Sequence, residues 1–120
     1  MKDNIIKQKS FLFAVRIIKL YKYLNNEHKE YVLSKQMLRS GTSIGANVRE
    51  ALNGESKSDF VHKLGIAQKE ADETMYWLEL LNETEFLKPH EFESMSADCI
   101  ELIKLLRSIV ITAKASIHNL

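Results

Sequence analysis

Apolar residues recur along most of the chain at alternating intervals of three and four residues, which is the period of a helix that buries one face. Alternating β-branched runs, which would indicate strands, do not occur. The pattern therefore predicts four helices, over about residues 4–26, 30–53, 57–83 and 89–116. The repeat is clearest in the third of these, where it passes through Phe60, Leu64, Ala67, Ala71, Thr74, Leu78 and Leu81.

Residues that begin and end helices stand between these segments. Ser56 can accept a hydrogen bond from the first turn of the third helix, and Pro89 suits the first turn of the fourth. Gly54 predicts the end of the second helix, because glycine adopts the left-handed conformation that follows many helices. Helices of this length joined by short loops pack antiparallel to their neighbours. The sequence thus predicts an all-α fold, an antiparallel up-down-up-down four-helix bundle made by a single domain over residues 1–120.

The first predicted helix has more apolar surface than one bundle core requires. Phe13, Ile17 and Leu24 share a face, and Phe11 and Ile18 widen that face to roughly half of the circumference. Apolar surface of this width is seldom left in contact with water. We therefore expect a second interface outside the core.

The segment SGTSIGANVREA, residues 40–51, has two glycines four residues apart. A phosphate-binding loop of the Walker type needs glycines five apart followed by Lys and Ser or Thr, and a dinucleotide-binding loop needs a preceding strand. Neither condition is met, so we interpret the segment as helix in which Gly41 and Gly45 admit a close neighbour. A polar stripe runs beside them, and it could face solvent, a helix of the same chain or a neighbouring subunit; it comprises Gln36, Ser40, Ser43, Asn47 and Glu50.

Composition and charge narrow the class of protein. The chain has 120 residues, 45% of them hydrophobic, and no apolar run of the length that a membrane span requires. Residues 1–69 carry 13 Lys or Arg and 6 Asp or Glu, whereas residues 70–101 carry ten acids and one base, Lys88. With one cysteine and no leader pattern, a cytoplasmic location is expected. The uneven charge suits a polyanionic partner or head-to-tail self-association.

The residue types that catalysis or metal binding would need are not grouped along the chain. Glu-x-x-His pairs, which hold metals in di-iron bundles, are absent from the sequence. Cys99 falls on an apolar seam and is expected to be a small buried hydrophobe. We therefore predict no enzyme activity, no cofactor and no metal site, and we interpret the four histidines as surface residues: His28, His62, His90 and His118.

The polar stripe and its surroundings resemble the R…SIxxNIxEG signature of bacterial four-helix-bundle proteins, also called ribosomal-RNA intervening-sequence proteins. The similarity extends over roughly residues 10–115, with Ala51 where the family usually has glycine and Lys69-Glu70 where it usually has Gly-Ser. The resemblance implies an up-down bundle that assembles into a five-fold ring, a homopentamer, without catalytic activity. Relatives include proteins encoded within insertions in 23S rRNA genes and a retroelement accessory protein that binds nucleic acid. The matching residues, expected at helix–helix or subunit contacts, are Arg39, Ser43, Ile44, Asn47, Glu50, Phe60 and Glu73.

Two functions fit these observations. The first is a non-enzymatic, ring-forming scaffold associated with RNA or DNA, in which basic side chains contact phosphates. The second is a protein-interaction module without nucleic acid, for which the acidic stretch from Glu70 to Glu101 would suit a basic partner. The candidate phosphate contacts are Arg16, Lys19 and Lys22 on the first helix, with Arg39, Arg49 and Lys57 further along the chain.

Overall fold

The computed structural model describes residues 2–118, which form four α-helices and no strand. The all-α four-helix fold predicted from the apolar repeat is confirmed. The helices are α1 (Lys2–His28), α2 (Leu33–Leu52), α3 (Lys57–Glu83) and α4 (Pro89–His118).

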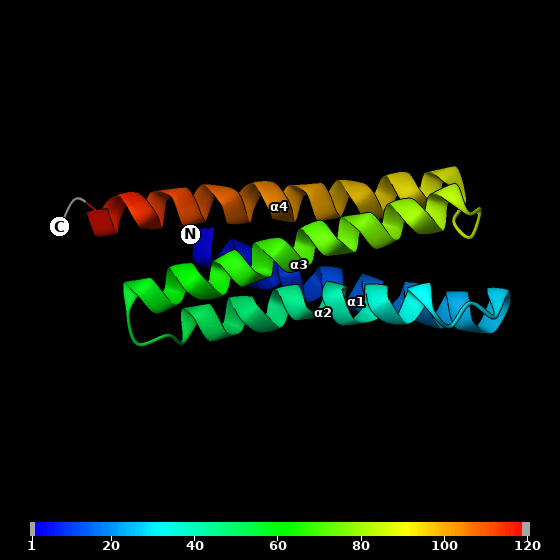
Figure 1. Cartoon of the computed structure of the whole chain (residues 1–120), viewed down its shortest axis with the longest axis horizontal. Helices are drawn as coiled ribbons and strands as arrows, with labels where there is room; N and C mark the ends of the chain where they lie inside the picture. Colours follow the sequence, from blue (N-terminus) through cyan, green and yellow to red (C-terminus); the bar gives the residue numbers. More distant parts are fainter. Residues whose placement is uncertain (1, 119–120) are drawn as a thin grey trace.

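The helices lie along the long axis of a rod that measures 52 × 21 × 21 Å, and successive helices run in opposite directions (Figure 1). Each helix contacts the helix that precedes or follows it in the chain, and α1 also contacts α4. The apolar repeats meet in one continuous core, because each helix turns its repeat toward the others. Its largest fully buried side chains include Phe13, Ile17, Leu24, Met37, Ile44, Leu64, Leu78 and Leu106.

Ser56 and Pro89 stand at the starts of α3 and α4 as predicted, and Glu91 adds a cap that the sequence pattern did not predict. The Ser56 hydroxyl accepts a hydrogen bond from the Asp59 amide at 3.0 Å, which satisfies one of the free amides of the first turn of α3. Pro89 is the first residue of α4, and the Glu91 carboxylate accepts from the Lys88 amide at 2.8 Å. Local capping therefore sets both boundaries.

The turn between α1 and α2 lies later than the pattern suggested. α1 continues through Asn26 to His28, and Lys29 adopts the left-handed conformation at φ 52° that glycine usually supplies. α2 does not begin at Glu30. Instead, the Glu30 carboxylate accepts hydrogen bonds from the amides of Val32, Leu33 and Ser34 at 2.7–3.1 Å, so that it caps the helix from outside.

Gly54 follows α2, but the reason for glycine is different from the one expected. No described glycine has positive φ, so a left-handed conformation is not what requires it. The Asn53 side chain and backbone both donate to the Arg49 carbonyl, at 3.0 and 3.2 Å, and this satisfies the end of the helix. A Cβ at Gly54 would lie 2.5 Å from Asp59 Oδ2 and 3.1 Å from the Ala51 carbonyl oxygen, so space beside the start of α3 is limited.

Candidate interaction surfaces

The segment at residues 40–51 lies within α2, and both of its glycines face α1 of the same chain. A Cβ at Gly41 would lie 2.8 Å from Cγ1 of Ile17, and a Cβ at Gly45 would lie 3.3 Å from the carbonyl oxygen of Ser10. The glycines therefore let two helices of one bundle approach closely, and the segment is not a phosphate-binding loop.

The polar stripe of α2 is held largely within the chain. The buried Thr74 hydroxyl of α3 donates to Ser40 Oγ at 2.9 Å, and Lys63 of α3 approaches Glu50 at 3.3 Å. Ser43 Oγ donates to the Arg39 carbonyl of its own helix at 2.6 Å, and Asn47 Nδ2 does the same to the Ser43 carbonyl at 2.9 Å. The stripe thus borders α3 and leaves only part of its polar surface free.

Arg39 joins α2 to α3 at this border. Its guanidinium forms ion pairs with Glu70, at 3.2 Å, and with Glu73, whose carboxylate also accepts from the Trp77 indole at 3.2 Å. Partial burial alone would lower the pKa of Arg39, but the hydrogen bond that it donates to Glu73 and the charges of both carboxylates raise it above its ordinary value. The group stays positive and links the helices.

The seven residues of the family signature all lie on α2 and α3. Ile44 is fully buried in the core, and Phe60 packs against the core at the start of α3. The remaining five are the polar residues already described: Arg39, Ser43, Asn47, Glu50 and Glu73. Within one chain, Arg39 and Glu50 join α2 to α3, whereas Ser43 and Asn47 bond to carbonyls of their own helix.

The basic residues predicted to contact phosphate are not gathered into one patch. On α1, Arg16 is engaged by α4: it forms an ion pair with Asp98 at 2.5 Å and donates to Ser94 Oγ at 2.8 Å. Lys19 lines a cleft of about 430 Å³ between α1 and α4, together with Tyr23 and His90. Lys22 is exposed on the outer side of α1.

The other three predicted contacts point to different neighbours. Arg39 is paired with carboxylates of α3 as described. The Arg49 guanidinium lies over the Phe11 ring, 5.6 Å from its centroid, in a cation–π contact. Lys57 Nζ donates to Ser116 Oγ at 2.6 Å, across the ends of α3 and α4. Of the six, Arg16 and Lys19 line a common cleft between α1 and α4.

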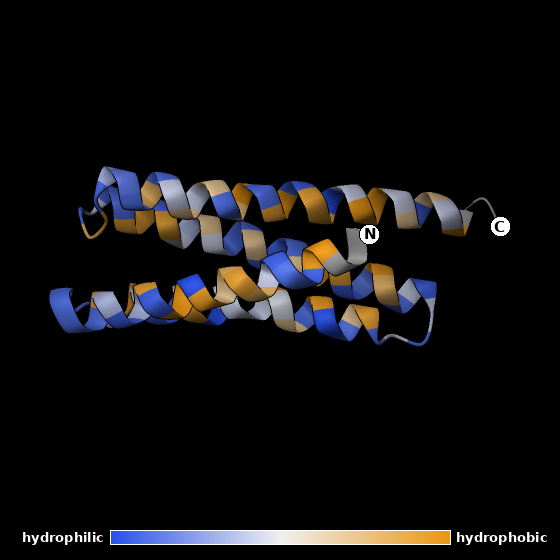
Figure 2. Cartoon of the chain, turned by 180° about the vertical axis from the view of Figure 1, so that it is seen from behind, coloured by the Kyte–Doolittle hydropathy of each residue, from blue (hydrophilic) through white to orange (hydrophobic). Residues whose placement is uncertain are grey.

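The outer side of α1 carries a surface that we call the α1 apolar face, made of Ile5, Phe11, Leu12 and Ile18. Phe11 and Leu12 are each more than half exposed, at 54% and 53%, and Ile5 and Ile18 are 40% and 39% exposed. In Figure 2 α1 lies in front, and hydrophobic residues recur along it. The core does not use this surface, which agrees with the excess apolar width expected for the first helix.

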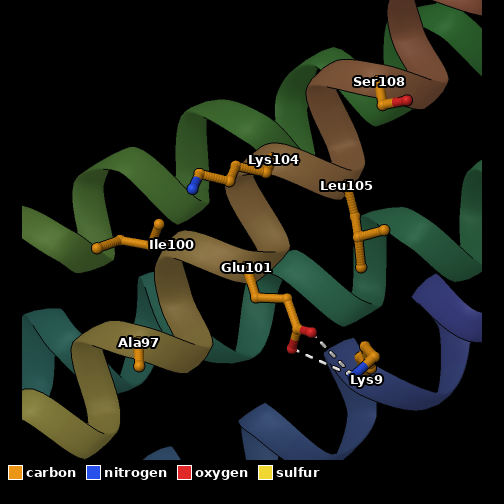
Figure 3. A pocket seen from close by; sticks show the side chains of 7 residues that line it. All are labelled: Lys9, Ala97, Ile100, Glu101, Lys104, Leu105 and Ser108. Carbon is orange, nitrogen blue, oxygen red and sulfur yellow. Dashed lines mark hydrogen bonds and ion pairs between the residues drawn. The ribbon is translucent and has the colours of Figure 1, made fainter.

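A second shallow depression, of about 430 Å³, lies on the outer side of α4 and is closed at one edge by α1. Figure 3 shows Lys9 of α1 reaching toward Glu101 of α4, and the Nζ–Oε2 distance is 3.1 Å. Ile100 and Leu105 supply apolar lining. The titratable residues of the depression are Lys9, Glu101 and Lys104, of which Lys9 and Glu101 are already joined in the ion pair.

Residues suited to metal or thiol chemistry are not brought together. The described residues contain no cluster of three or more His, Cys, Asp or Glu side chains that could hold a metal ion. Cys99 is buried and donates to the Ala71 carbonyl at 3.3 Å; burial, assisted by the charges of Asp72 and Asp98, raises the pKa of its thiol to about 12. The side chain of His118 lies outside the described part. No helix in this part is long and apolar enough to cross a bilayer.

Sequence reasoning missed the ion pairs that α1 makes with α4, Lys9 with Glu101 and Arg16 with Asp98. The available signal was the charge pattern, in which residues 4–26 contain no acid and residues 70–101 contain ten. It also missed the outer side of α3, where Ser58, His62, Gly65, Lys69, Asp72, Tyr76, Glu79 and Glu83 repeat at the same spacing as the core positions.

Fold and surfaces together define the class, an all-α four-helix protein with an exposed apolar helix face. The chain belongs to the family described as 23S rRNA-intervening sequence protein, whose sequence model matches residues 2–108. The resemblance inferred from the α2 signature is therefore confirmed. A crystal structure from Bacteroides thetaiotaomicron, a protein of unknown function of the S23 ribosomal protein family, is 60% identical with a TM-score of 0.91. The match covers 92% of this chain and 98% of that one. No curated protein matches the chain.

Proposed function

We propose that this protein is a non-enzymatic helical scaffold that assembles with copies of itself and associates with nucleic acid, RNA in particular. The observation that carries the proposal is the α1 apolar face, which the core leaves open and which a second subunit would cover. The family description, which refers to 23S rRNA, supports RNA as the partner. We further propose the ring of five subunits that the family resemblance implies, a cytoplasmic location, and a single domain over residues 1–120.

The assembly is tested by molar mass from light scattering, which should be at least five times the 13.9 kDa of the chain. Leu12→Glu places a charge in the α1 apolar face and should reduce the mass well below that of five chains. Ile111→Glu is the matched control, because Ile111 is 62% exposed on α4, away from that face. A monomeric wild-type protein, or equal effects of both substitutions, would refute assembly through α1.

The RNA association rests on Lys19 and Lys22, which are exposed on the outer side of α1. In the described part of the structure neither lysine forms an ion pair with a carboxylate. Each phosphate contact contributes to a salt-dependent affinity, and a ring would repeat the pair in every subunit. The double substitution Lys19→Glu, Lys22→Glu should weaken binding of a structured RNA at low salt, measured by fluorescence anisotropy. Lys35→Glu, on the exposed side of α2, is the control and should bind as wild type. Absence of RNA and DNA binding by the wild-type protein at low salt would exclude this part of the proposal.

The alternative, a protein-interaction module without nucleic acid, is favoured by one observation. Arg16 and Arg39 are already paired with Asp98, Glu70 and Glu73, so two of the six predicted phosphate contacts are neutralised within the chain. Affinity capture from cell extract, with and without nuclease, separates the two functions. A protein partner that remains bound after nuclease treatment would support the alternative, and loss of all partners would support the nucleic-acid scaffold.

A further inference from the structure

The outer side of α3 presents a second regular seam, opposite the one that enters the core. Seven of its eight residues are exposed and Gly65 is half-buried. In the described part of the structure, Lys69, Asp72, Glu79 and Glu83 have no salt bridge or side-chain hydrogen bond. We call this seam the α3 outer face; its residues are Ser58, His62, Gly65, Lys69, Asp72, Tyr76, Glu79 and Glu83.

The α3 outer face carries an open groove at one end and an exposed aromatic side chain toward the other. A Cβ at Gly65 would meet nothing within 4 Å, so glycine is not required there by packing inside the chain. The glycine lines a groove of about 460 Å³, together with the apolar side chains of Val61, Ile66 and Val110. Tyr76 lies three turns further along the same face and is 55% exposed. An exposed aromatic ring and an open groove on the same helix face, three turns apart, favour a partner that brings the ring of one copy to the groove of another.

Charge on the α3 outer face is divided between its two halves. The half near the start of α3 carries His62 and Lys69, with Lys114 of α4 across the groove, and the other half carries Asp72, Glu79 and Glu83. A polyanion such as RNA would be repelled by the acidic half. A second copy of this chain, lying antiparallel, would instead place opposite charges against each other.

The spacing of the face is symmetric about the middle of α3. In an antiparallel arrangement of two such faces, Lys69 lies opposite Asp72 of the second copy, and Gly65 lies opposite Tyr76. In the same register His62 lies opposite Glu79, and Ser58 lies opposite Glu83. A two-fold contact makes each of these pairs twice.

We propose that the α3 outer face binds the same face of a second copy through a two-fold contact, with each Tyr76 ring entering the groove beside Gly65 of the other subunit. The contact uses α3 and the end of α4, and it is separate from the α1 apolar face. The proposed α3 contact is therefore independent of assembly through α1.

The register is tested by disulfide trapping with the double variant His62→Cys, Glu79→Cys. These positions are 17 residues apart on one helix, about 25 Å, so they cannot join within a chain. Oxidation should give a covalent dimer on a non-reducing gel. The matched control His62→Cys, Glu83→Cys is displaced by one turn and should cross-link at least about tenfold less, because a disulfide needs Cα atoms within about 7 Å. Both variants are also made with Leu12→Glu, and trapping that persists there assigns the contact to α3 rather than α1.

A charge exchange provides a readout that misfolding would not reproduce. In the Leu12→Glu background, where assembly through α1 is removed, Lys69→Asp or Asp72→Lys alone should lower the dimer fraction in sedimentation velocity by severalfold, and the two substitutions together should restore it. Tyr76→Ala and Gly65→Leu should each lower it, while Lys35→Asp should leave it unchanged. Equal trapping of the two cysteine pairs, or no rescue by the charge exchange, would overturn the proposal. Loss of RNA binding by Tyr76→Ala without loss of trapping would assign the aromatic side chain to RNA and overturn its role in the dimer.

Discussion

Gly41 of α2 and Gly65 of α3 are both glycines in the interior of long helices, but their surroundings are opposite. The space above Gly41 is filled by Ile17 of α1, whose side-chain carbons would lie 2.8–3.0 Å from an added Cβ. The space above Gly65 is empty to at least 4 Å. Each glycine costs its helix about 1 kcal/mol relative to alanine. Only at Gly41 does a contact inside the chain offset that cost.

The difference separates two kinds of surface in this small bundle. The side of α2 that bears Gly41 is completed by α1 of the same chain, and changing it should alter folding. The side of α3 that bears Gly65 is complete only if something outside the chain covers it, and changing it should alter association while leaving the fold intact. Substitutions at these and related positions can test the distinction.

The largest effect is expected for Gly41→Ala. The added methyl group would overlap Ile17, which is fully buried and has no free space to enter, so overpacking should outweigh the gain in helix propensity. We expect the free energy of unfolding to fall by about 2 kcal/mol, measured by urea denaturation.

The control for Gly41→Ala makes the neighbouring side chain, Ile17, smaller. Ile17→Val removes one methyl group, so the double variant should lose less stability than the sum of the two single variants. Additive losses would show that the methyl group at position 41 does not act through Ile17.

The next effect concerns the inner side of α3, where Ala71 meets Cys99 of α4. Because burial raises the pKa of the Cys99 thiol to about 12, above its ordinary value of 9.0, the unfolded chain releases this proton at lower pH than the folded one. The free energy of unfolding should therefore fall as pH rises from 9 toward 12, by about 1.4 kcal/mol per pH unit from this group. Urea denaturation at pH 8 and pH 10 measures the fall, and Cys99→Ala should show a smaller one. An identical pH dependence in the two proteins would contradict the assignment to Cys99.

A smaller effect, of opposite sign, is expected for Gly65→Ala. The methyl group enters open space and improves helix propensity, so the free energy of unfolding should rise by about 1 kcal/mol at protein concentrations where the chain is monomeric. Thermal unfolding followed by circular dichroism measures this as a higher Tm. A lower Tm would show that the space beside Gly65 is filled within the chain.

Much of the fold could be predicted from periodicity. Four helices joined by short connections have few arrangements in which the apolar face of every helix is buried. The repeat through Met37, Ile44 and Val48 entered the core as expected. The α1–α2 turn could not be placed from sequence. It depends on Lys29 adopting a left-handed conformation and on Glu30 capping three amides, and neither residue type is typical of those roles.

The surfaces were less predictable, because sequence shows which residues share a helix face but not what lies opposite. The clustering of Arg16 and Lys19 with Lys22 on α1 suggested phosphate contacts. Arg16, however, forms an ion pair with Asp98 of α4, which is far away in the chain. In the same way, Gly41, Gly45 and Gly65 look alike in the sequence. Only the neighbours that the fold supplies distinguish them.

Gly45 has surroundings intermediate between those of Gly41 and Gly65, and Gly45→Ala should have the smallest effect on stability. An added Cβ would lie 3.3 Å from the Ser10 carbonyl oxygen, which is tight but does not overlap. That oxygen belongs to the backbone of α1 and can yield only if the whole helix shifts by a few tenths of an ångström. The cost of this shift should nearly cancel the gain in helix propensity, and the free energy of unfolding should change by less than about 0.5 kcal/mol.

Urea denaturation of the Gly41→Ala, Gly45→Ala and Gly65→Ala variants compares the three changes in the free energy of unfolding directly. A gain as large as that of Gly65→Ala would mean that α1 is free to move away from α2. A loss as large as that of Gly41→Ala would mean that the two backbones are locked together at Ser10.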